Sequence, residues 1–170
     1  MFDYHTLTHE AVLAAAADIY ASNRAYLNLI DGNETESGEA RLQRDLNQPP
    51  PNGEPRFFRL VAEHGRAVAV LDYVSGYPTV RSAYLGLLMV HSSLHGRGIG
   101  SRIVADLSQR LRENGCQRLR LSVLDDNPDA YRFWARLGFE PIEHKTAKFP
   151  TADGVVRKTV TVLEKTLDYS

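Results

Sequence analysis

Residues 85–101 read LGLLMVHSSLHGRGIGS, and this is the most informative segment of the sequence for predicting the fold. The apolar run 85–90 predicts a buried strand, and the glycines that follow His95 predict a tight loop. Apolar residues then recur at helical spacing from Ile99 to Leu111, which predicts a helix directly after the loop. A strand, a glycine-rich loop and a helix in this order can bind an anion, because the first N–H groups of the helix and its dipole attract negative charge.

The spacing of the glycines excludes two common phosphate-binding motifs. Gly96, Gly98 and Gly100 do not fit the G-x-G-x-x-G pattern of dinucleotide-binding proteins, since position 101 is Ser. The Lys-Ser/Thr pair that ends a P-loop is missing as well. The alternative at this point is a strand-to-helix turn that is rich in glycine and binds nothing.

A second motif follows about 30 residues later, where residues 127–139 read NPDAYRFWARLGF. Asn127 is placed to cap a helix and Pro128 to be its first residue. Gly138 is placed to end that helix. The segment therefore predicts a second short helix, whose apolar face includes Phe133 and Trp134.

Together the two motifs resemble those of the GNAT N-acetyltransferase superfamily. Its acetyl-CoA motif, Gln/Arg-x-x-Gly-x-Gly/Ala, reads here from His95 to Gly100. Its second motif, Asn-x-x-Ala-x-x-Phe/Leu-Tyr/Trp-x-x-x-Gly-Phe, is matched within 127–139. The resemblance covers about 57–146, the expected acetyl-CoA core. It implies one α+β domain over 1–170, with a mixed, twisted sheet of six to seven strands and helices on both faces.

The resemblance also implies a set of contacts with acetyl-CoA. Two neighbouring parallel strands, at about 80–90 and 117–124, would splay to admit the cofactor. A backbone N–H near Met89 and Val90 would polarise the thioester carbonyl, and the loop after them would cradle the pyrophosphate. The residues implied to bind the cofactor are Leu88, Met89, Val90, His95, Gly96, Arg97, Gly98, Ile99, Gly100, Ser101, Asn127, Tyr131 and Trp134.

The chain departs from the family at three positions. His95 replaces Gln or Arg, Gly86 replaces a glutamate that serves many members as general base, and Trp134 replaces a tyrosine that serves as general acid. An indole does not supply a proton at neutral pH. Tyr131 lies three residues before Trp134, roughly on the same helix face, and is the candidate acid. The candidate substrate contacts are Asp72, Tyr73 and Tyr84, on strands expected to face the cleft.

The composition of the chain limits the kinds of binding partner that we expect for it. The 170 residues include 20 Lys and Arg against 21 Asp and Glu, so no strong positive field favours nucleic acid or an anionic membrane as a partner. No apolar run approaches the roughly 20 residues that span a bilayer, and the N-terminus lacks the pattern of a secretory signal. Cys116 is the single cysteine. We expect a cytoplasmic protein without a disulfide or a metal site.

The remaining elements are predicted from local patterns. A helix begins after Thr8 as N-cap, and Asp31-Gly32-Asn33 forms a turn. The segment 31–56 is a long loop with a short helix around 40–46, and 21–56 is the variable, acceptor-side part of the chain. Further strands are expected at 2–7, 57–63, 67–74, 80–90, 118–124, 139–146 and 155–167.

The predicted function follows from the resemblance. The acetyl group of acetyl-CoA, a co-substrate, moves to a primary amine by direct attack in a ternary complex, without a metal. The acceptor is a small molecule or a protein or peptide amine, and a homodimer is common in this family. Because both familiar proton carriers are missing, a non-catalytic acyl-CoA-binding or sensory domain is the alternative.

Overall fold

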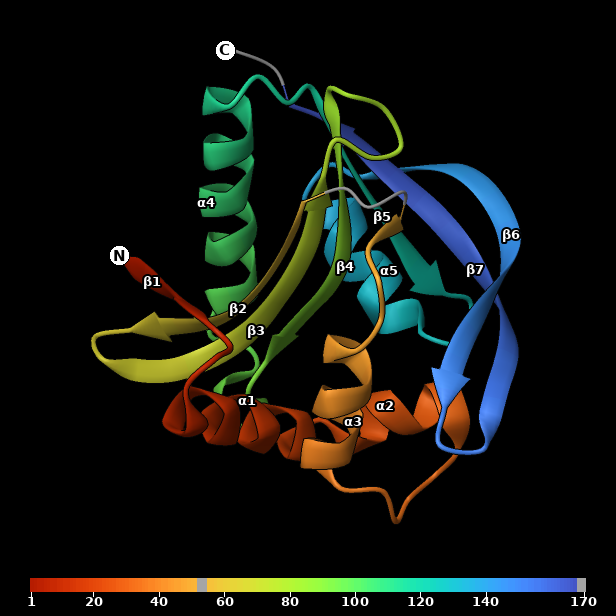
Figure 1. Cartoon of the computed structure of the whole chain (residues 1–170). Helices are drawn as coiled ribbons and strands as arrows, with labels where there is room; N and C mark the ends of the chain where they lie inside the picture. The colour runs from red at the N-terminus through yellow and green to blue at the C-terminus, as the bar shows by residue number, and fades with distance from the viewer. Residues whose placement is uncertain (52–54, 168–170) are drawn as a thin grey trace.

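The computed structural model describes residues 1–51 and 55–167, and within them seven strands form one mixed sheet (Figure 1). Their order across the sheet is β1-β2-β3-β4-β5-β7-β6. Among these, β4 and β5 run parallel and the other neighbours run antiparallel. The strands are β1 (Phe2–Thr6), β2 (Arg56–Glu63), β3 (Arg66–Ser75), β4 (Ser82–Val90), β5 (Arg118–Leu124), β6 (Glu140–Thr151) and β7 (Gly154–Thr166).

Helices cover both faces of this sheet, as the resemblance implied. Successive residues of a strand point to opposite faces, so Val61 and Leu71 enter the core under α4 while Leu60 and Val70 enter the core under α1. The first core also takes side chains of α5, and the second takes side chains of α2 and α3. The helices are α1 (Glu10–Ser22), α2 (Arg24–Asp31), α3 (Gly38–Leu46), α4 (Ile99–Glu113) and α5 (Pro128–Arg136), with a 3-10 turn, η2, at Ser92–Leu94.

The two parallel strands separate part-way along their length. They pair from Ser82↔Arg118 to Leu85↔Leu121, although β4 continues to Val90 and β5 to Leu124. A β-bulge lies at the point of separation, since Leu85 pairs with Tyr73 while Leu87 pairs with Asp72, which leaves Gly86 as the extra residue. A bulge bends its strand and increases the local twist, so β4 turns away from β5 beyond Gly86.

Several boundaries differ from those predicted. His9, not Thr8, is the N-cap of α1, because His9 is extended and its carbonyl accepts the first helical bond, from Leu13 N at 2.9 Å. The helix α2 was not predicted, since no Gly or Pro separates it from α1. The hairpin of β6 and β7 is longer than expected, because pairing continues to Thr151↔Gly154.

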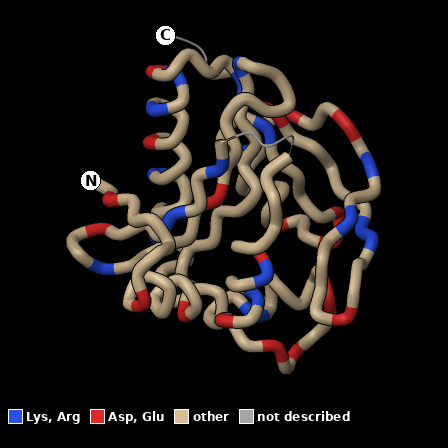
Figure 2. The backbone as a smooth tube through the Cα atoms, viewed as in Figure 1, with Lys and Arg blue, Asp and Glu red and all other residues tan. Residues whose placement is uncertain are grey.

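The segment between α2 and β2 is more ordered than the predicted loop. The helix α3 fits the predicted short helix and starts earlier, because the Ser37 side chain caps it by accepting a bond from Ala40 N. Arg41, only 4% exposed, pairs with Asp31 and Glu36 and ties the turn after α2 to α3. Acidic residues of this turn lie at the lower edge of the molecule in Figure 2. Residues 52–54 of the predicted segment lie outside the described residues.

None of the described helices combines the length and the apolarity that crossing a membrane requires.

Candidate functional site

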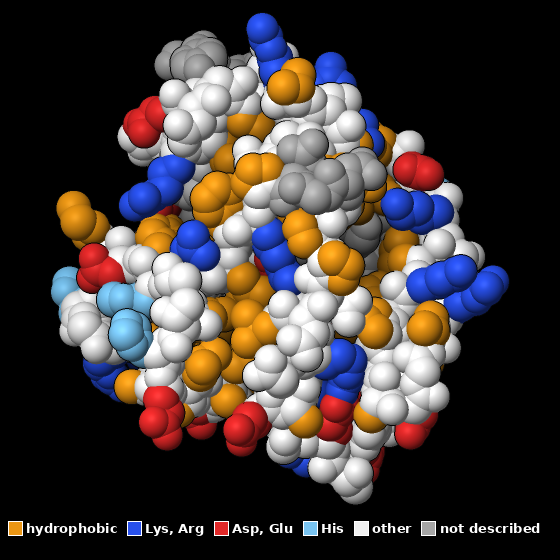
Figure 3. Space-filling view, in the orientation of Figure 1, with side chains coloured by type: hydrophobic (Ala, Val, Ile, Leu, Met, Phe, Trp, Pro, Cys, Tyr) orange, Lys and Arg blue, Asp and Glu red, His pale blue; other side chains and the backbone are white. Residues whose placement is uncertain are grey.

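A cavity of about 880 Å³ occupies the space between the separated strands. Its walls come from β4, from the loop that leads into α4, from the end of β5 and from α5. On the face shown in Figure 3, hydrophobic side chains gather near the middle and several acidic side chains lie along the lower border. The cavity is large enough for an extended organic ligand, since ligand pockets usually measure about 300–1,000 Å³.

The edge of β4 that faces this cavity has a defined set of backbone groups. His91 N donates to Val68 O on β3 at 2.8 Å. Because backbone groups alternate in direction along a strand, those of Met89 also point to β3, whereas those of Leu88 and Val90 point toward the cavity. Of the two residues expected to polarise a carbonyl, Val90 therefore presents its N–H to the cavity and Met89 does not.

The carbonyl of Val90 confirms this orientation. It accepts hydrogen bonds from Asn23 Nδ2 at 3.0 Å and from His95 Nε2 at 2.9 Å. Asn23 is 7% exposed and joins α1 to α2, while His95 stands at the start of the glycine-rich loop. The two side chains fix the end of β4 between the helix layer and the loop, so the Val90 N–H is held in place.

The loop after His95 ends at the first turn of α4. Gly98 is the N-cap of α4 and has φ 75°, a left-handed conformation that glycine adopts without strain. No side chain caps this helix end, and the first helical bond runs from Arg102 N to Gly98 O. The N–H groups of residues 99–101 thus have no partner within the helix and are available to an anion.

Gly100 serves a different purpose, which is close packing of α4 against α5. A Cβ atom at this position would lie 3.2 Å from the ring of Phe133. Phe133 in turn packs edge-on against Trp134, with ring centroids 4.9 Å apart, and Trp134 packs edge-on against Phe139 at 5.2 Å. Trp134 therefore lines the cavity and anchors α5 to the core at once.

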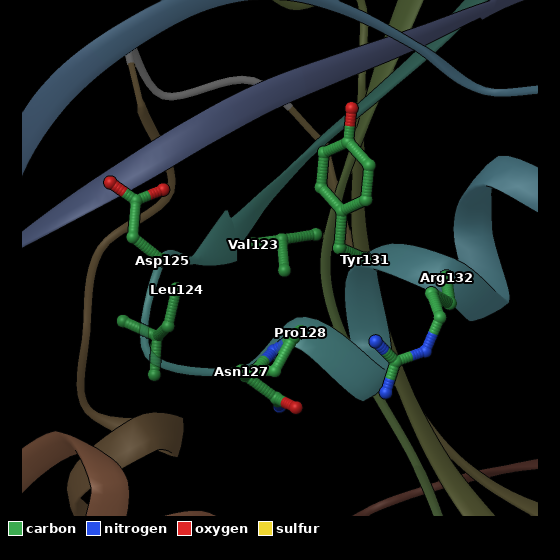
Figure 4. Close-up of a pocket in the computed structure, with 7 residues that line it drawn as sticks. All are labelled: Val123, Leu124, Asp125, Asn127, Pro128, Tyr131 and Arg132. Carbon is green, nitrogen blue, oxygen red and sulfur yellow. The ribbon is translucent and has the colours of Figure 1, made fainter.

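Tyr131 does not line that cavity, although it was predicted to bind the cofactor. The Asn127 side chain caps α5 by accepting a bond from Ala130 N at 3.2 Å, and Asn127 lines the large cavity. Tyr131 lines a separate cavity of about 210 Å³ with Val123, Asp125 and Arg132. Its ring and the Asn127 side chain point in opposite directions (Figure 4). Residues three apart differ by about 60° around a helix, which suffices here to place Tyr131 and Trp134 in different cavities.

The three candidate substrate contacts occupy three different environments. Tyr84 lines the large cavity, and its hydroxyl bonds Ser122 Oγ across the gap between β4 and β5. Tyr73 stacks on Phe57, with ring centroids 4.8 Å apart, and packs into the core under α4, so its prediction as a cleft residue was wrong. Neighbouring residues of a strand point to opposite faces, so Tyr73 and Asp72 could not both face the cleft.

Asp72 lies on the face covered by α1 and α3. It forms a bidentate pair with Arg56, at 2.9 Å from Nε to Oδ1 and 2.7 Å from Nη2 to Oδ2. Of the remaining predicted residues, Arg97 does not line the large cavity, whereas the other residues of the loop segment 95–101 do.

One family model matches residues 17–139, and its description is acetyltransferase (GNAT) family. The chain belongs to the GNAT acetyltransferase family. Curated relatives agree with this assignment. An acetyltransferase of Pectobacterium atrosepticum is 28% identical over 107 residues, which cover 62% of this chain and 69% of that protein. An acetyltransferase of Yersinia enterocolitica is 32% identical over 104 residues, which cover 60% and 67%.

Solved structures share the fold of this GNAT acetyltransferase over nearly its whole length. An acetyltransferase of Thermus thermophilus has a TM-score of 0.70 at 21% identity, covering 98% of this chain and 97% of that one. The ribosomal-protein-S18-alanine N-acetyltransferase of Escherichia coli has a TM-score of 0.65 at 17% identity, covering 100% and 96%. An aminoglycoside 6'-N-acetyltransferase complexed with coenzyme A has a TM-score of 0.63 at 18% identity, covering 100% and 98%.

One wall of the cavity in this GNAT acetyltransferase includes residues of the segment 21–56, which was predicted as variable and acceptor-side, and residues of β6, which were not predicted to line the site. Tyr26 and Ile30 reach it from α2, and Lys145, Ala147 and Phe149 reach it from β6. Burial raises the pKa of Tyr26, and the nearby Asp45 raises it further. The signal for the β6 residues was their alternate spacing, which places three side chains on one face of a strand. That signal was missed because the strand was expected to end at 146.

Proposed function

We propose that this GNAT acetyltransferase transfers the acetyl group of acetyl-CoA to a primary amine by direct attack in a ternary complex. The observation that carries the proposal is the open edge of β4, where the Val90 N–H faces a cavity that continues to the uncapped start of α4. One end of the cavity thus suits a polarised carbonyl and the other suits a phosphate. Acetyl-CoA carries both groups and supplies the activated acetyl group.

The residues present fit that co-substrate. The N–H groups of residues 99–101 are without helical partners and would bind the pyrophosphate. Leu88 offers its backbone N–H and carbonyl along the cavity and Val90 its N–H, since the Val90 carbonyl is bound by Asn23 and His95. An extended amide-containing arm can pair with such a strand edge. Trp134 and Phe133 give the opposite wall an apolar surface. The Val90 N–H would then bind the carbonyl oxygen and stabilise the negative charge that develops there during attack.

The chain's contribution to the reaction is positioning and charge stabilisation. Holding an amine and a thioester together removes most of the entropy cost of their encounter. The described residues that line the large cavity include no cysteine and two serines. Ser122 bonds Tyr84, and Ser101 lies in the first turn of α4, where we propose that the pyrophosphate binds. Direct attack by the amine therefore suits this site better than a covalent acyl-enzyme.

The acceptor enters, on this proposal, at the wall formed by α2 and β6. Tyr26, Ile30 and Phe149 make this wall largely apolar, and Lys145 adds a cation. Among the structural neighbours, one is named for an aminoglycoside acceptor and another for a ribosomal protein. Both a small-molecule amine and a peptide amine therefore belong in the test.

The test is a panel assay with purified protein and acetyl-CoA. Free CoA thiol is measured with small amines, polyamines, aminoglycosides and peptides with free N-termini, and acetyl-CoA affinity is measured by calorimetry. We expect micromolar binding and turnover with at least one class. Binding without turnover on any amine would favour the non-catalytic sensory domain, and failure to bind CoA would overturn both functions. Unchanged turnover after treatment with a chelator is expected, because we propose no metal.

A further inference from the structure

We propose that Asp72 is the proton acceptor for the attacking amine, and that the missing side chain of Gly86 gives the amine access to it. The inference rests on the proposed function, since it needs an amine acceptor. It assigns to β3 the carboxylate that many members of the family carry on β4 at the position of Gly86.

Asp72 is the residue nearest to the space that a side chain at Gly86 would occupy. Gly86 is exposed and lines the large cavity. A Cβ atom built on Gly86 would lie 3.6 Å from Asp72 Oδ2, and the other neighbours within 4 Å also belong to Asp72. The bulge that makes Gly86 the extra residue of β4 places it opposite Asp72. Asp72 does not line the cavity itself, but its carboxylate lies in contact distance of the place that a side chain at position 86, on the cavity wall, would occupy.

The carboxylate is held in place and keeps room for a proton. Arg56 binds both oxygens of Asp72, which fixes the plane of the group. Each carboxylate oxygen has two lone pairs, so one on each oxygen remains after the pairing. The Asp72 side chain is 15% exposed, enough to contact a water molecule or a ligand atom in the gap.

The groups around Asp72 favour a cation on its open side. Asp45 of α3 lies close by, and it accepts a bond from the Tyr20 hydroxyl of α1 at 2.6 Å. Arg56 Nη2 reaches the backbone carbonyl of Asp45 at 2.9 Å. The Asp45 carboxylate also feels the charges of Arg56 and Asp72, and this acidic cluster attracts a positive charge when both carboxylates are ionised. An ammonium group entering from the α2 and β6 wall carries that charge.

Other carboxylates and hydroxyls at the cavity fit this role less well. Asp129 also lines the cavity, but its side chain is 89% exposed and pairs with Arg132 at the start of α5. The Tyr84 hydroxyl is engaged with Ser122. Asp45 is engaged with Tyr20. Neither Asp45 nor Asp72 lines the cavity itself, but the three atoms nearest to a Cβ built on Gly86 all belong to Asp72.

The proton moves in balance with the acetyl group. The acceptor ammonium gives one proton to the Asp72 carboxylate, directly or through one water, and becomes a neutral amine. The amine nitrogen forms a bond to the thioester carbon, and the carbon–sulfur bond breaks. The nitrogen gives its second proton to the departing sulfur, which leaves as CoA thiol, and Asp72 returns its proton to solvent. The products are the amide, CoA and one proton.

Two variants separate a chemical role of Asp72 from a structural one. Asp72→Asn keeps the shape of the side chain and one acceptor for Arg56, but it does not take up a proton. Gly86→Ala leaves the Asp72–Arg56 pair intact and closes the gap with a methyl group in ordinary contact. Asp106→Asn is the control, because Asp106 also pairs with an arginine, Arg110, at 2.8 Å on the opposite face of the sheet.

The experiment measures kcat, acetyl-CoA affinity and melting temperature with an amine that the wild-type protein acetylates. We expect Asp72→Asn to lower kcat by about 10²–10⁴-fold with acetyl-CoA affinity unchanged. It should also move the acid limb of the pH–rate profile to higher pH, because without a base only amine that is already neutral reacts. Gly86→Ala should also lower kcat, and Gly86→Glu added to Asp72→Asn should move the acid limb back toward its wild-type position. Asp106→Asn should match the wild type in kcat.

The results that overturn the inference are distinct from those that overturn the proposed function. Absence of turnover by the wild-type protein would remove the proposed function, and this inference with it. An active wild type whose Asp72→Asn variant keeps both its kcat and its acid limb would overturn the role of Asp72 alone. A fall in kcat that tracks an equal loss of acetyl-CoA affinity, with Gly86→Ala unaffected, would also overturn it, because a structural role predicts that result.

Discussion

Asn23 Nδ2 donates a hydrogen bond to the carbonyl oxygen of Val90 at 3.0 Å, across 67 positions of sequence. Asn23 also donates to Ile19 O, at the end of α1, at 2.9 Å. One buried amide thus joins the first two helices to the strand edge that we propose to hold the thioester. Asn23 therefore links the helices of the proposed acceptor wall to the strand edge of the proposed thioester site.

Replacing Asn23 by Ala should destabilise the protein by about 1–3 kcal/mol, because buried carbonyls lose a donor that water does not replace. His95→Ala removes the other donor to the same carbonyl, but His95 is exposed. Water can take its place, so we expect a loss below about 0.5 kcal/mol. Urea unfolding of both variants tests the difference, and equal losses would contradict the coupling role of Asn23.

Gly98→Asp should weaken acetyl-CoA binding by about 100-fold or more, because a carboxylate would stand where the phosphates bind. The matched control is Gly98→Asn, since asparagine has the same shape and tolerates the left-handed conformation better than most residues. A Cβ at this position meets nothing within 4 Å. Calorimetry with acetyl-CoA compares the two. Equal affinities would refute the assignment of this loop to the pyrophosphate.

Phe149→Ala should raise the KM for the acceptor by about tenfold, which corresponds to about 1.4 kcal/mol of lost apolar contact. Phe149 lies on the β6 wall of the cavity. Acetyl-CoA affinity should stay unchanged, because the proposed cofactor contacts lie on β4, α4 and α5. Val155→Ala is the control on the same hairpin, since Val155 is 62% exposed and does not line the cavity. A loss of acetyl-CoA affinity in Phe149→Ala would place the acceptor elsewhere.

Tyr131→Phe should leave kcat within about twofold of the wild type. Tyr131 was the sequence-based candidate for the general acid, but it lines the small neighbouring cavity, not the large one, and is 36% exposed. The substitution removes only the hydroxyl. Steady-state kinetics across pH give the answer, and a large fall in kcat with unchanged acetyl-CoA affinity would restore Tyr131 as the acid.

The sequence predicted the glycine-rich loop and the cap of α5 much better than the cavity wall formed by α2 and β6. The loop of residues 95–101 and the cap at Asn127 depend on local chemistry, namely glycine conformations and a capping side chain, which short motifs record. The acceptor wall depends on contacts between distant segments. Phe149 arrives on a hairpin from the C-terminal part of the chain, and Tyr26 on a helix whose start has no Gly or Pro.

The orientation of residues on β3 was also not predictable from the sequence alone. Which of Asp72 and Tyr73 faces the cleft depends on the register of β3 against β4 and on the bulge at Gly86. Periodicity within one strand does not contain that information. The bulge also brings position 86 close to Asp72. The sequence alone does not show which residue lies next to Gly86, so it does not show what the missing side chain leaves accessible.

Asp45→Asn should make stability less dependent on pH. Burial raises the pKa of Asp45 from 3.8, while the hydrogen bond from Tyr20 opposes this shift. A carboxyl group with a raised folded pKa binds its proton more tightly in the native state than in the unfolded chain. The stability gained from its protonation is therefore present at low pH, and it is lost as the pH rises from about 3.8 through the folded pKa.

Asparagine is neutral throughout and can still accept the Tyr20 hydroxyl, so Asp45→Asn avoids the cost of a buried charge at neutral pH. We expect its melting temperature relative to the wild type to increase between about pH 4 and pH 7. Tyr20→Phe should do the opposite, because it removes the hydrogen bond that favours the charged form and so steepens the loss with rising pH. Thermal unfolding of the three proteins across this range tests the prediction. If Asp45→Asn is less stable than the wild type by the same amount at every pH, the prediction is wrong. The carboxylate would then stabilise the fold through its packing, and its burial as a charged group would not destabilise the fold at neutral pH.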